Sequence, residues 1–225
     1  MQTMKKLLIL LTIFFTTTLF GQAKQGKELS DFLPKGFVIS ETIHGDLNKD
    51  GIEDCVLIIK GTDKSKIIKD ENGEETDRNR RGIVILFNKN NYYELAVKNG
   101  TCFSSENEDG GVYFAPELSI EIDKGKLNIR YEQGRYGYCK YSFRYQNSDF
   151  ELIGYDSSDD SGPIVNRITS VNFLSKKKQI KENINQNAEE GEEVYKETWE
   201  KIQVDKLVRL SEIKNFDELE YYTEK

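Results

Sequence analysis

The sequence predicts a mainly β fold, an antiparallel meander of about 9–11 strands in a sandwich-like or partial-propeller sheet. Two observations predict it. Short runs with alternating apolar and polar residues follow one another from residue 37 to residue 155, and turn residues end each run. Only three prolines occur, and hairpin-length turns separate neighbouring runs, which favours strands that pair with their sequence neighbours.

Two neighbouring runs show this alternation most clearly. Their apolar residues share one face each: Leu118, Ile120 and Ile122 in the first run, and Leu127, Ile129 and Tyr131 in the second. The turn between them contains Gly125, which can adopt positive φ in a tight hairpin. The pattern predicts a hairpin with one face exposed to water.

The first 23 residues are typical of a secretory signal peptide. Lys5 and Lys6 form a basic start, the stretch Leu7–Phe20 is apolar apart from four threonines, and small or polar residues follow up to Ala23. A membrane-spanning helix needs roughly 20 apolar residues, so this stretch is too short. An uncleaved anchor is the alternative. The sequence therefore predicts a periplasmic or secreted protein with no membrane span in its mature form.

The rest of the chain is predicted to form one domain. Residues 24–36 are polar and predict a linker, and 37–225 predict a single β-rich domain. Within it, 62–81 predict a charged surface loop, and 185–225 predict an irregular or partly helical C-terminal segment. Four apolar residues of that segment recur at helical spacing, although 202–210 equally fit a strand: Val194, Tyr195, Trp199 and Ile202.

The charge of the chain argues against nucleic acid as a partner. Lys5 and Lys6 are the only charged residues among the first 23, so the remainder has 30 basic and 39 acidic residues. A net charge of −9 follows for this remainder. Such a surface repels phosphate backbones and suits a basic protein partner.

The segment 45–54 carries the sharpest chemical signal. Oxygen-bearing side chains occupy loop positions one, three, five and nine, namely Asp46, Asn48, Asp50 and Asp54. Calcium takes six to eight oxygen ligands, which these side chains and the backbone carbonyl of Ile52 at position seven can supply. Gly51 at position six permits the sharp turn. The alternative is that the Asp and Asn side chains only make polar turns with their own backbone.

This DxNxDGxxD loop, which enters the apolar run Cys55–Ile59, resembles the calcium loop of FG-GAP and VCBS-type β repeats. It is not an EF-hand, because position twelve is Leu57 rather than Glu and β-type sequence follows. The resemblance covers Gly45–Lys60 and implies a metal loop that ties two strands together. Such repeats normally occur in series, and this sequence has one copy, so the resemblance implies the loop without the full propeller.

The three cysteines leave one pairing open. Cys55 lies in an apolar run and is predicted to be a small buried residue. Cys102 and Cys139 lie in polar, turn-rich sequence and can pair if their strands are neighbours. The odd count leaves at least one thiol without an intramolecular partner.

No catalytic residue is predicted. His44 is the only histidine, which excludes a zinc hydrolase with two or more histidine ligands. Acidic pairs that can flank a sugar bond do occur: Glu106, Glu108 and Asp109, or Glu117 and Glu121. With 39 acidic residues in the chain, solvated strand faces explain these pairs better.

A cluster of six tyrosines between residues 131 and 155 predicts a binding surface. Arg135, Tyr136 and Tyr138 are expected at an exposed hairpin tip, where tyrosine and arginine give large contact areas. Core and edge packing is the alternative use of these rings.

Taken together, these features predict a non-enzymatic, calcium-stabilised, periplasmic or secreted binding protein. Its partner is expected to be a protein of the cell envelope or a glycan, for example as an inhibitor or immunity factor against an envelope-acting protein. The alternative is a carbohydrate-binding or glycan-hydrolysing protein that uses a carboxylate pair.

Overall fold

The computed structural model describes residues 25–69, 73–107 and 115–219, and the predicted signal peptide lies outside these ranges. The predicted mainly β, antiparallel fold is confirmed. The described residues form 14 strands, of which 11 have seven or more residues. No helix in these ranges is long and apolar enough to cross a membrane.

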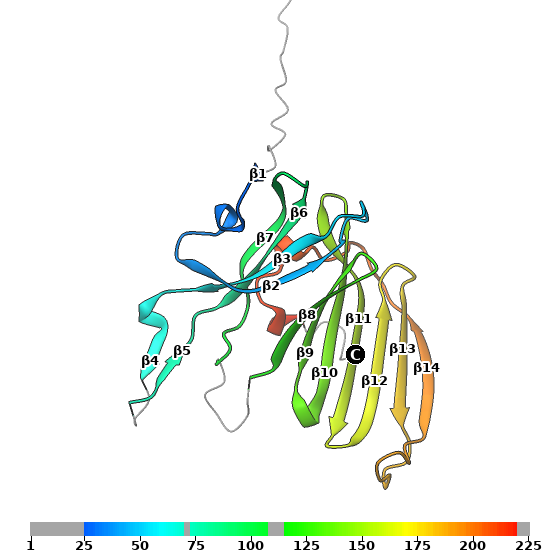
Figure 1. The fold of residues 1–225 in the computed structure, drawn as a ribbon. Coiled ribbons are helices and arrows are strands. Elements are labelled where there is room, and N and C mark those ends of the chain that lie inside the picture. Colours follow the sequence, from blue (N-terminus) through cyan, green and yellow to red (C-terminus); the bar gives the residue numbers. More distant parts are fainter. Residues whose placement is uncertain (1–24, 70–72, 108–114, 220–225) are drawn as a thin grey trace, which may run out of the picture.

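Two larger antiparallel sheets and one small hairpin contain all the strands of the described residues (Figure 1). The five-stranded sheet has the order β1-β7-β6-β3-β2 and consists of β1 (Gln25–Gly26), β2 (Phe37–Gly45), β3 (Asp54–Gly61), β6 (Arg81–Asn88) and β7 (Tyr93–Phe103). The seven-stranded sheet is a meander in sequence order: β8 (Glu117–Asp123), β9 (Lys126–Glu132), β10 (Gly137–Gln146), β11 (Asp149–Ser161), β12 (Ile164–Asn172), β13 (Lys177–Asn183) and β14 (Tyr195–Lys201). The hairpin consists of β4 (Ile67–Lys69) and β5 (Glu75–Asp77).

Five short 3-10 turns accompany the strands of the described residues: η1 (Leu29–Phe32), η2 (Lys64–Lys66), η3 (Gly134–Tyr136), η4 (Leu210–Glu212) and η5 (Phe216–Glu218). The hairpin turns have the backbone that their sequences predict. Gly125 has a φ of 74° between β8 and β9, and Asn147 and Ser148 have φ values of 53° and 61° between β10 and β11.

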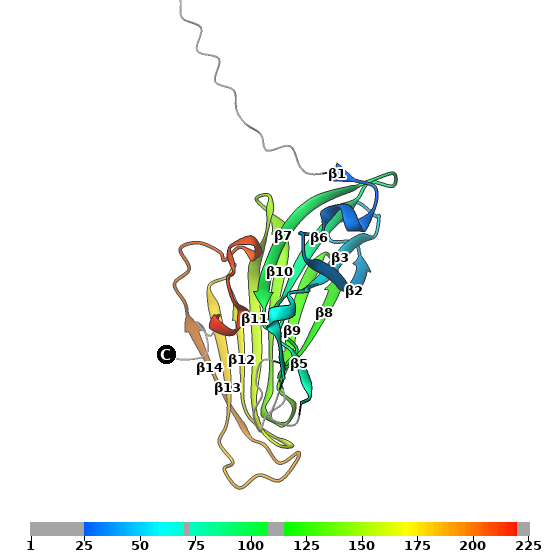
Figure 2. The same cartoon turned by 90° about the vertical axis from the view of Figure 1, so that its left-hand side faces the viewer.

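The main core lies between the two sheets, which face each other in Figure 2. Alternation along the strands supplies its residues, such as Ile83 and Ile85 on β6, Ile129 on β9 and Phe143 on β10. All four side chains are fully buried.

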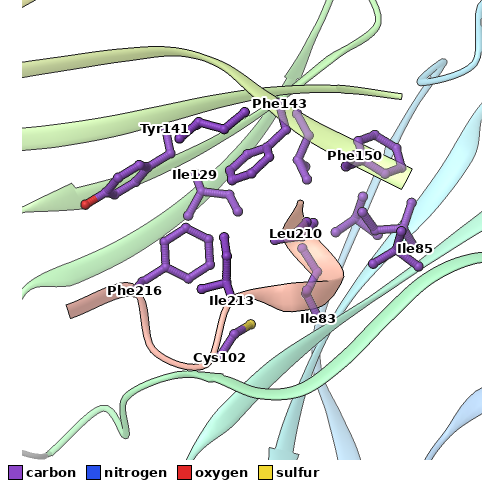
Figure 3. Packing of buried hydrophobic residues seen from close by; sticks show 14 of the residues in the cluster. Ile83, Ile85, Cys102, Ile129, Tyr141, Phe143, Phe150, Leu210, Ile213 and Phe216 are labelled. Atoms are coloured by element: carbon purple, nitrogen blue, oxygen red, sulfur yellow. The ribbon is translucent and has the colours of Figure 1, made fainter. Parts of the chain in front are cut away.

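The C-terminal segment completes this core. Leu210, Ile213 and Phe216 enter between the sheets and contact the inner faces of both (Figure 3). The ring of Phe216 lies 5.1 Å from that of Phe103 on β7 and 5.3 Å from that of Tyr141 on β10, measured between centroids. The segment therefore joins the two sheets.

The N-terminal segment differs from the expected linker at 24–36. Residues 25–36 form β1 and η1, and the Phe32 side chain is fully buried against the outer face of the five-stranded sheet. Leu57 and Ile59 on β3 are buried beneath it, so β3 is covered on both faces. The apolar run of β3 is continuous for this reason. The partly buried Leu29 and Leu33 pack beside Phe32, and β1 pairs with β7, so this segment is held against the sheet.

The segment 62–81 also has more structure than a charged loop. β4 and β5 pair into an arm that extends from the five-stranded sheet (Figure 1), while residues 70–72 lie outside the described ranges. The segment ends within the sheet, because Arg81 starts β6 and is buried there.

The C-terminal segment 185–225 is irregular, as expected, and contains one further strand among its described residues. Residues Tyr195–Lys201 form β14 at the edge of the large sheet, where an extended strand presents Trp199 beside Gln179 of β13. The helical spacing of its apolar residues therefore does not produce an α-helix. Residues 220–225 lie outside the described ranges.

Candidate functional site

The predicted calcium loop connects β2 to β3, and its own side chains shape it. The backbone N–H of Asp50 donates to Asn48 Oδ1 at 2.8 Å, and the N–H of Ile52 donates to Asp50 Oδ1 at 3.0 Å. These are the local polar turns that Asn and Asp favour. Lys49 and Gly51 have φ values of 64° and 86°, which tighten the loop around its polar side chains.

Asp54 anchors the loop from inside the protein. The residue is fully buried, and its carboxylate accepts the backbone N–H groups of Leu47 at 2.9 Å, Asn48 at 3.2 Å and Asn88 at 3.1 Å. Burial raises the pKa of the Asp54 carboxyl, and these hydrogen bonds act in the opposite direction. Because Asn88 ends β6, Asp54 connects the loop to the neighbouring strand.

Three polar side chains of the loop contact one another. The Asn48 side-chain amide donates to Asp50 Oδ2 at 3.0 Å and lies 3.5 Å from Asp54 Oδ1. Asp46 Oδ2 accepts the backbone N–H of Gly51 at 3.0 Å. Asp46 Oδ1 is buried and has no hydrogen-bond partner among the described residues. The structure thus brings three of the four predicted side chains into contact, Asn48, Asp50 and Asp54. The Asp46 side chain binds the Gly51 N–H instead, and its second oxygen receives no donor from the described part of the chain.

A lysine already balances part of the charge of the loop. Lys89 Nζ lies 3.1 Å from Asp50 Oδ2. The pKa of the Asp50 carboxyl is lowered, first by the N–H of Ile52 and then by Lys89. The hydrogen bond to Asp50 in turn raises the pKa of Lys89. No local pattern points to Lys89, which lies 39 residues away from Asp50.

The loop is wedged against the large sheet. Leu47 is buried in the core between the sheets. A Cβ atom at Gly45 would lie 2.7 Å from the Ile122 side chain on β8, so a larger residue there would collide. A hollow of about 370 Å³ separates the loop from the β8–β9 turn, and Asp46 and Gly125 are among its lining residues. The shape of the loop is therefore coupled to the packing of one sheet on the other.

Within the described ranges, no three His, Cys, Asp or Glu side chains form a metal-binding group. Asp46, Asp50 and Asp54 lie within these ranges, so their carboxylates do not form such a group in the structure. Ile52 itself is half-buried, and its N–H binds within the loop.

The predicted partner surface lies around η3, at the end of the large sheet remote from the β8–β9 turn. Tyr136 is 46% exposed, and the Arg135 guanidinium carbon lies 5.8 Å from the centre of its ring. Tyr138 is half-buried, and its ring stacks on the guanidinium group of Arg130 at 3.5 Å. Arg135 and Tyr136 are therefore exposed as predicted, whereas the Tyr138 ring is occupied by an intramolecular contact.

Tyr136 and Tyr138 also line a cavity of about 410 Å³ that reaches across β10, β11 and β12. Sequence analysis missed three of its other lining residues, Ser157, Arg167 and Thr169. The pairing register of the meander places them together, since Ser157 lies opposite Thr169 and Asp159 lies opposite Arg167. No alternating pattern marks these residues in the sequence, because 157–161 are all polar, and only the strand register brings them together.

The acidic residues considered for glycan hydrolysis are engaged in an ion pair, exposed on a strand, or outside the described residues. Glu106 lies 3.4 Å from Lys60 Nζ and 3.7 Å from Arg81, so it is an ion-pair partner. Glu117 and Glu121 are exposed on β8. Glu108 and Asp109 lie outside the described residues.

The three cysteines are unpaired in the structure. Cys55 is fully buried, as predicted, and burial raises the pKa of its thiol to about 11. Cys102 is fully buried on β7, and burial raises its pKa to about 12. Cys139 is half-buried on β10, in the opposite sheet.

Comparison of the chain with protein-family models, with curated proteins and with solved structures finds no match in any of the three. The likeness of Gly45–Lys60 to FG-GAP and VCBS calcium loops therefore stays a resemblance of one motif.

Proposed function

We propose that this chain is a non-enzymatic, periplasmic or secreted binding protein whose β2–β3 loop holds a calcium ion as part of its fold. The observation that carries the proposal is the buried Asp46 Oδ1, which has no donor among the described residues and lies in the same loop as the mutually contacting side chains of Asn48, Asp50 and Asp54. A buried carboxylate oxygen without a partner is costly, and a cation removes that cost.

The loop residues offer the oxygen ligands that calcium prefers. Asp46, Asn48, Asp50 and Asp54 offer side-chain oxygens, and the carbonyl of Ile52 follows the turn at Gly51. Hard oxygen ligands of this kind select calcium over the softer transition metals. The ion would neutralise three carboxylates that otherwise depend on backbone N–H groups and on Lys89.

Calcium would stabilise the protein because the loop it binds is packed into the core. Leu47 is buried between the sheets and Asp54 binds the end of β6, so fixing the loop fixes a junction of the core. A ligand that binds only the folded state raises stability with the logarithm of its concentration relative to Kd.

Isothermal titration calorimetry with CaCl₂, and thermal unfolding with calcium or with EDTA, test the proposal. We expect one bound ion per chain and a rise in Tm that Asp46→Asn and Asp50→Asn both reduce. Asp63→Asn is the matched control, because Asp63 makes the same kind of local turn with Ser65 at an exposed position. A chain that shows no heat and no change in Tm would refute the calcium site.

The proposed partner is a protein of the cell envelope, and an inhibitor or immunity factor against an envelope-acting protein is the specific form we favour. The net charge of −9 outside the first 23 residues supports a basic target, since complementary charges accelerate encounter. A pull-down from envelope extracts, with and without EDTA, tests this. Recovery of one stoichiometric protein, reduced by EDTA, is the expected result, and recovery of none would refute a protein partner.

A carbohydrate-binding protein is the second candidate, and the cavity beside Tyr136 favours it. Tyrosine rings and hydroxyl groups around a concave site suit a sugar. The hydrolytic version has less support, because Glu106 is engaged by Lys60 and Arg81. Release of reducing sugar from envelope glycans, lost in Glu117→Gln or Glu121→Gln, would establish it instead.

A further inference from the structure

The cavity of about 410 Å³ on the large sheet continues the inner face of that sheet beyond the packed core. Along β11, Tyr155 borders the core, and Ser157 follows it on the same face of the sheet. Along β12, Thr169 borders the core, and Arg167 lies further along the same face. Phe216 covers the face as far as Tyr141, because the two rings pack with their centroids 5.3 Å apart. In Figure 3 the Tyr141 hydroxyl points away from the packed cluster.

Arg167 supplies a positive charge to this cavity. Its Nε atom is buried without a hydrogen-bond partner, and within the described ranges Arg167 has no ion pair. A guanidinium group stays charged at any ordinary pH and has no way to relieve burial by losing its proton. Its planar N–H groups match the two oxygens of a carboxylate.

The surroundings of Arg167 narrow the class of anion. Asp159 lies opposite it in the sheet register and lines the same cavity, so this pair of positions combines one cation with one carboxylate. A phosphate dianion would be repelled by the Asp159 carboxylate, and the single guanidinium group of Arg167 would neutralise only one of its two charges. A carboxylate carries a single charge and needs one such group.

The remaining lining groups match a ligand rich in hydroxyl groups. Ser157 and Thr169 offer hydroxyls that both donate and accept, and Tyr136 and Tyr155 offer rings with polar tips. The cavity volume lies within the range of about 300–1,000 Å³ typical of small-molecule sites. An acidic peptide would place apolar or amide groups against these hydroxyls, which fit it less well.

We propose that this cavity binds an acidic saccharide, with a uronate carboxylate paired to Arg167 and ring hydroxyls bound by Ser157, Thr169 and Asp159. This inference rests on the second candidate function, carbohydrate binding, and gives it a ligand class and a place to bind. The cavity lies at the η3 end of the sheet, where the exposed Tyr136 forms part of its lining.

Isothermal titration calorimetry on the full mature chain tests the site with three probes: a galacturonic acid trisaccharide, the neutral galactose trisaccharide and a triglutamate peptide. We expect the uronate to bind at least about tenfold more tightly than the neutral sugar, as loss of a charge-assisted pair implies. Arg167→Gln should remove this preference, and Arg167→Lys should keep part of it because the charge remains.

Arg144→Gln is the matched control, since Arg144 lies on β10 on the face opposite Phe143 and should leave binding unchanged. Circular dichroism and Tm show whether each variant is folded. Equal binding of the neutral sugar, tighter binding of the peptide, or an unchanged preference in folded Arg167→Gln would overturn the assignment.

The calcium measurements separate this inference from the proposed function. A chain that binds calcium and a chelator-sensitive envelope protein but ignores the uronate would overturn the cavity site alone. A chain that binds the uronate but shows no response to calcium would overturn the metal loop alone.

Discussion

Leu210→Ala tests whether the C-terminal segment holds the two sheets together. Leu210 is fully buried between the sheets, and truncation of a buried leucine to alanine costs about 2–5 kcal/mol. The upper part of this range applies, because the Asn99 side-chain amide donates to the carbonyls of Leu210 at 2.8 Å and Ile213 at 2.7 Å. These bonds fix the backbone, so the cavity has little freedom to collapse.

Urea unfolding followed by circular dichroism measures the effect on the free energy of unfolding. A loss of about 3–5 kcal/mol is expected. For a domain of this size it corresponds to a fall in Tm of about 6–20 °C. Leu174→Ala is the matched control, because Leu174 is 47% exposed in a turn and should change stability by less than about 0.5 kcal/mol. If the two variants unfold alike, Leu210 does not fill the core and the C-terminal segment does not join the sheets.

Four further predictions concern the backbone, the Cys102 thiol and the β2–β3 loop. Gly82→Ala should cost about 1–3 kcal/mol by urea unfolding, because its Cβ would collide with the carbonyl of Gly100 on β7, whereas Gly154→Ala, with its nearest contact at 3.6 Å, should stay within about 1 kcal/mol of the parent. The Cys102 thiol, whose pKa burial raises to about 12, should resist iodoacetamide at pH 8 until the protein unfolds; rapid native labelling would contradict its burial. Because the folded protein holds the Cys102 proton more tightly than the unfolded chain, the contribution of this thiol to the free energy of unfolding is complete below about pH 9 and is lost as the pH rises toward about 12. Alkaline unfolding of Cys102→Ala, compared with the parent, measures this contribution. Lys89→Met should raise calcium affinity about two- to fivefold by removing the ammonium group that competes at Asp50, and unchanged affinity would show that this contact does not compete.

The strands and their local turns follow from the sequence because they depend on near neighbours. The alternation at 118–122 and 127–131 specifies a face, and Gly125 specifies a hairpin turn, without any distant contact. The β2–β3 loop follows in the same way, because Asn48 and Asp50 shape it through bonds to backbone groups two residues away.

Other parts of the fold depend on which distant groups share the core. Phe32 anchors a polar segment because the outer face of β3 is apolar, and no local pattern reveals that pairing. Likewise, β14 has residues at helical spacing but lies beside β13, where the backbone groups of the sheet edge favour an extended strand.

The sequence by itself determined the mainly β class, the meander and the polar loop between residues 45 and 54, since each depends on interactions within a few residues. Only the tertiary structure decided that Lys89 lies at Asp50, that residues 210–216 fill the space between the sheets, and that Arg167 lines a cavity. The physical reason is that register and sheet packing bring these groups together across long stretches of chain, and a one-residue shift in register would turn a strand residue such as Arg167 to the opposite face.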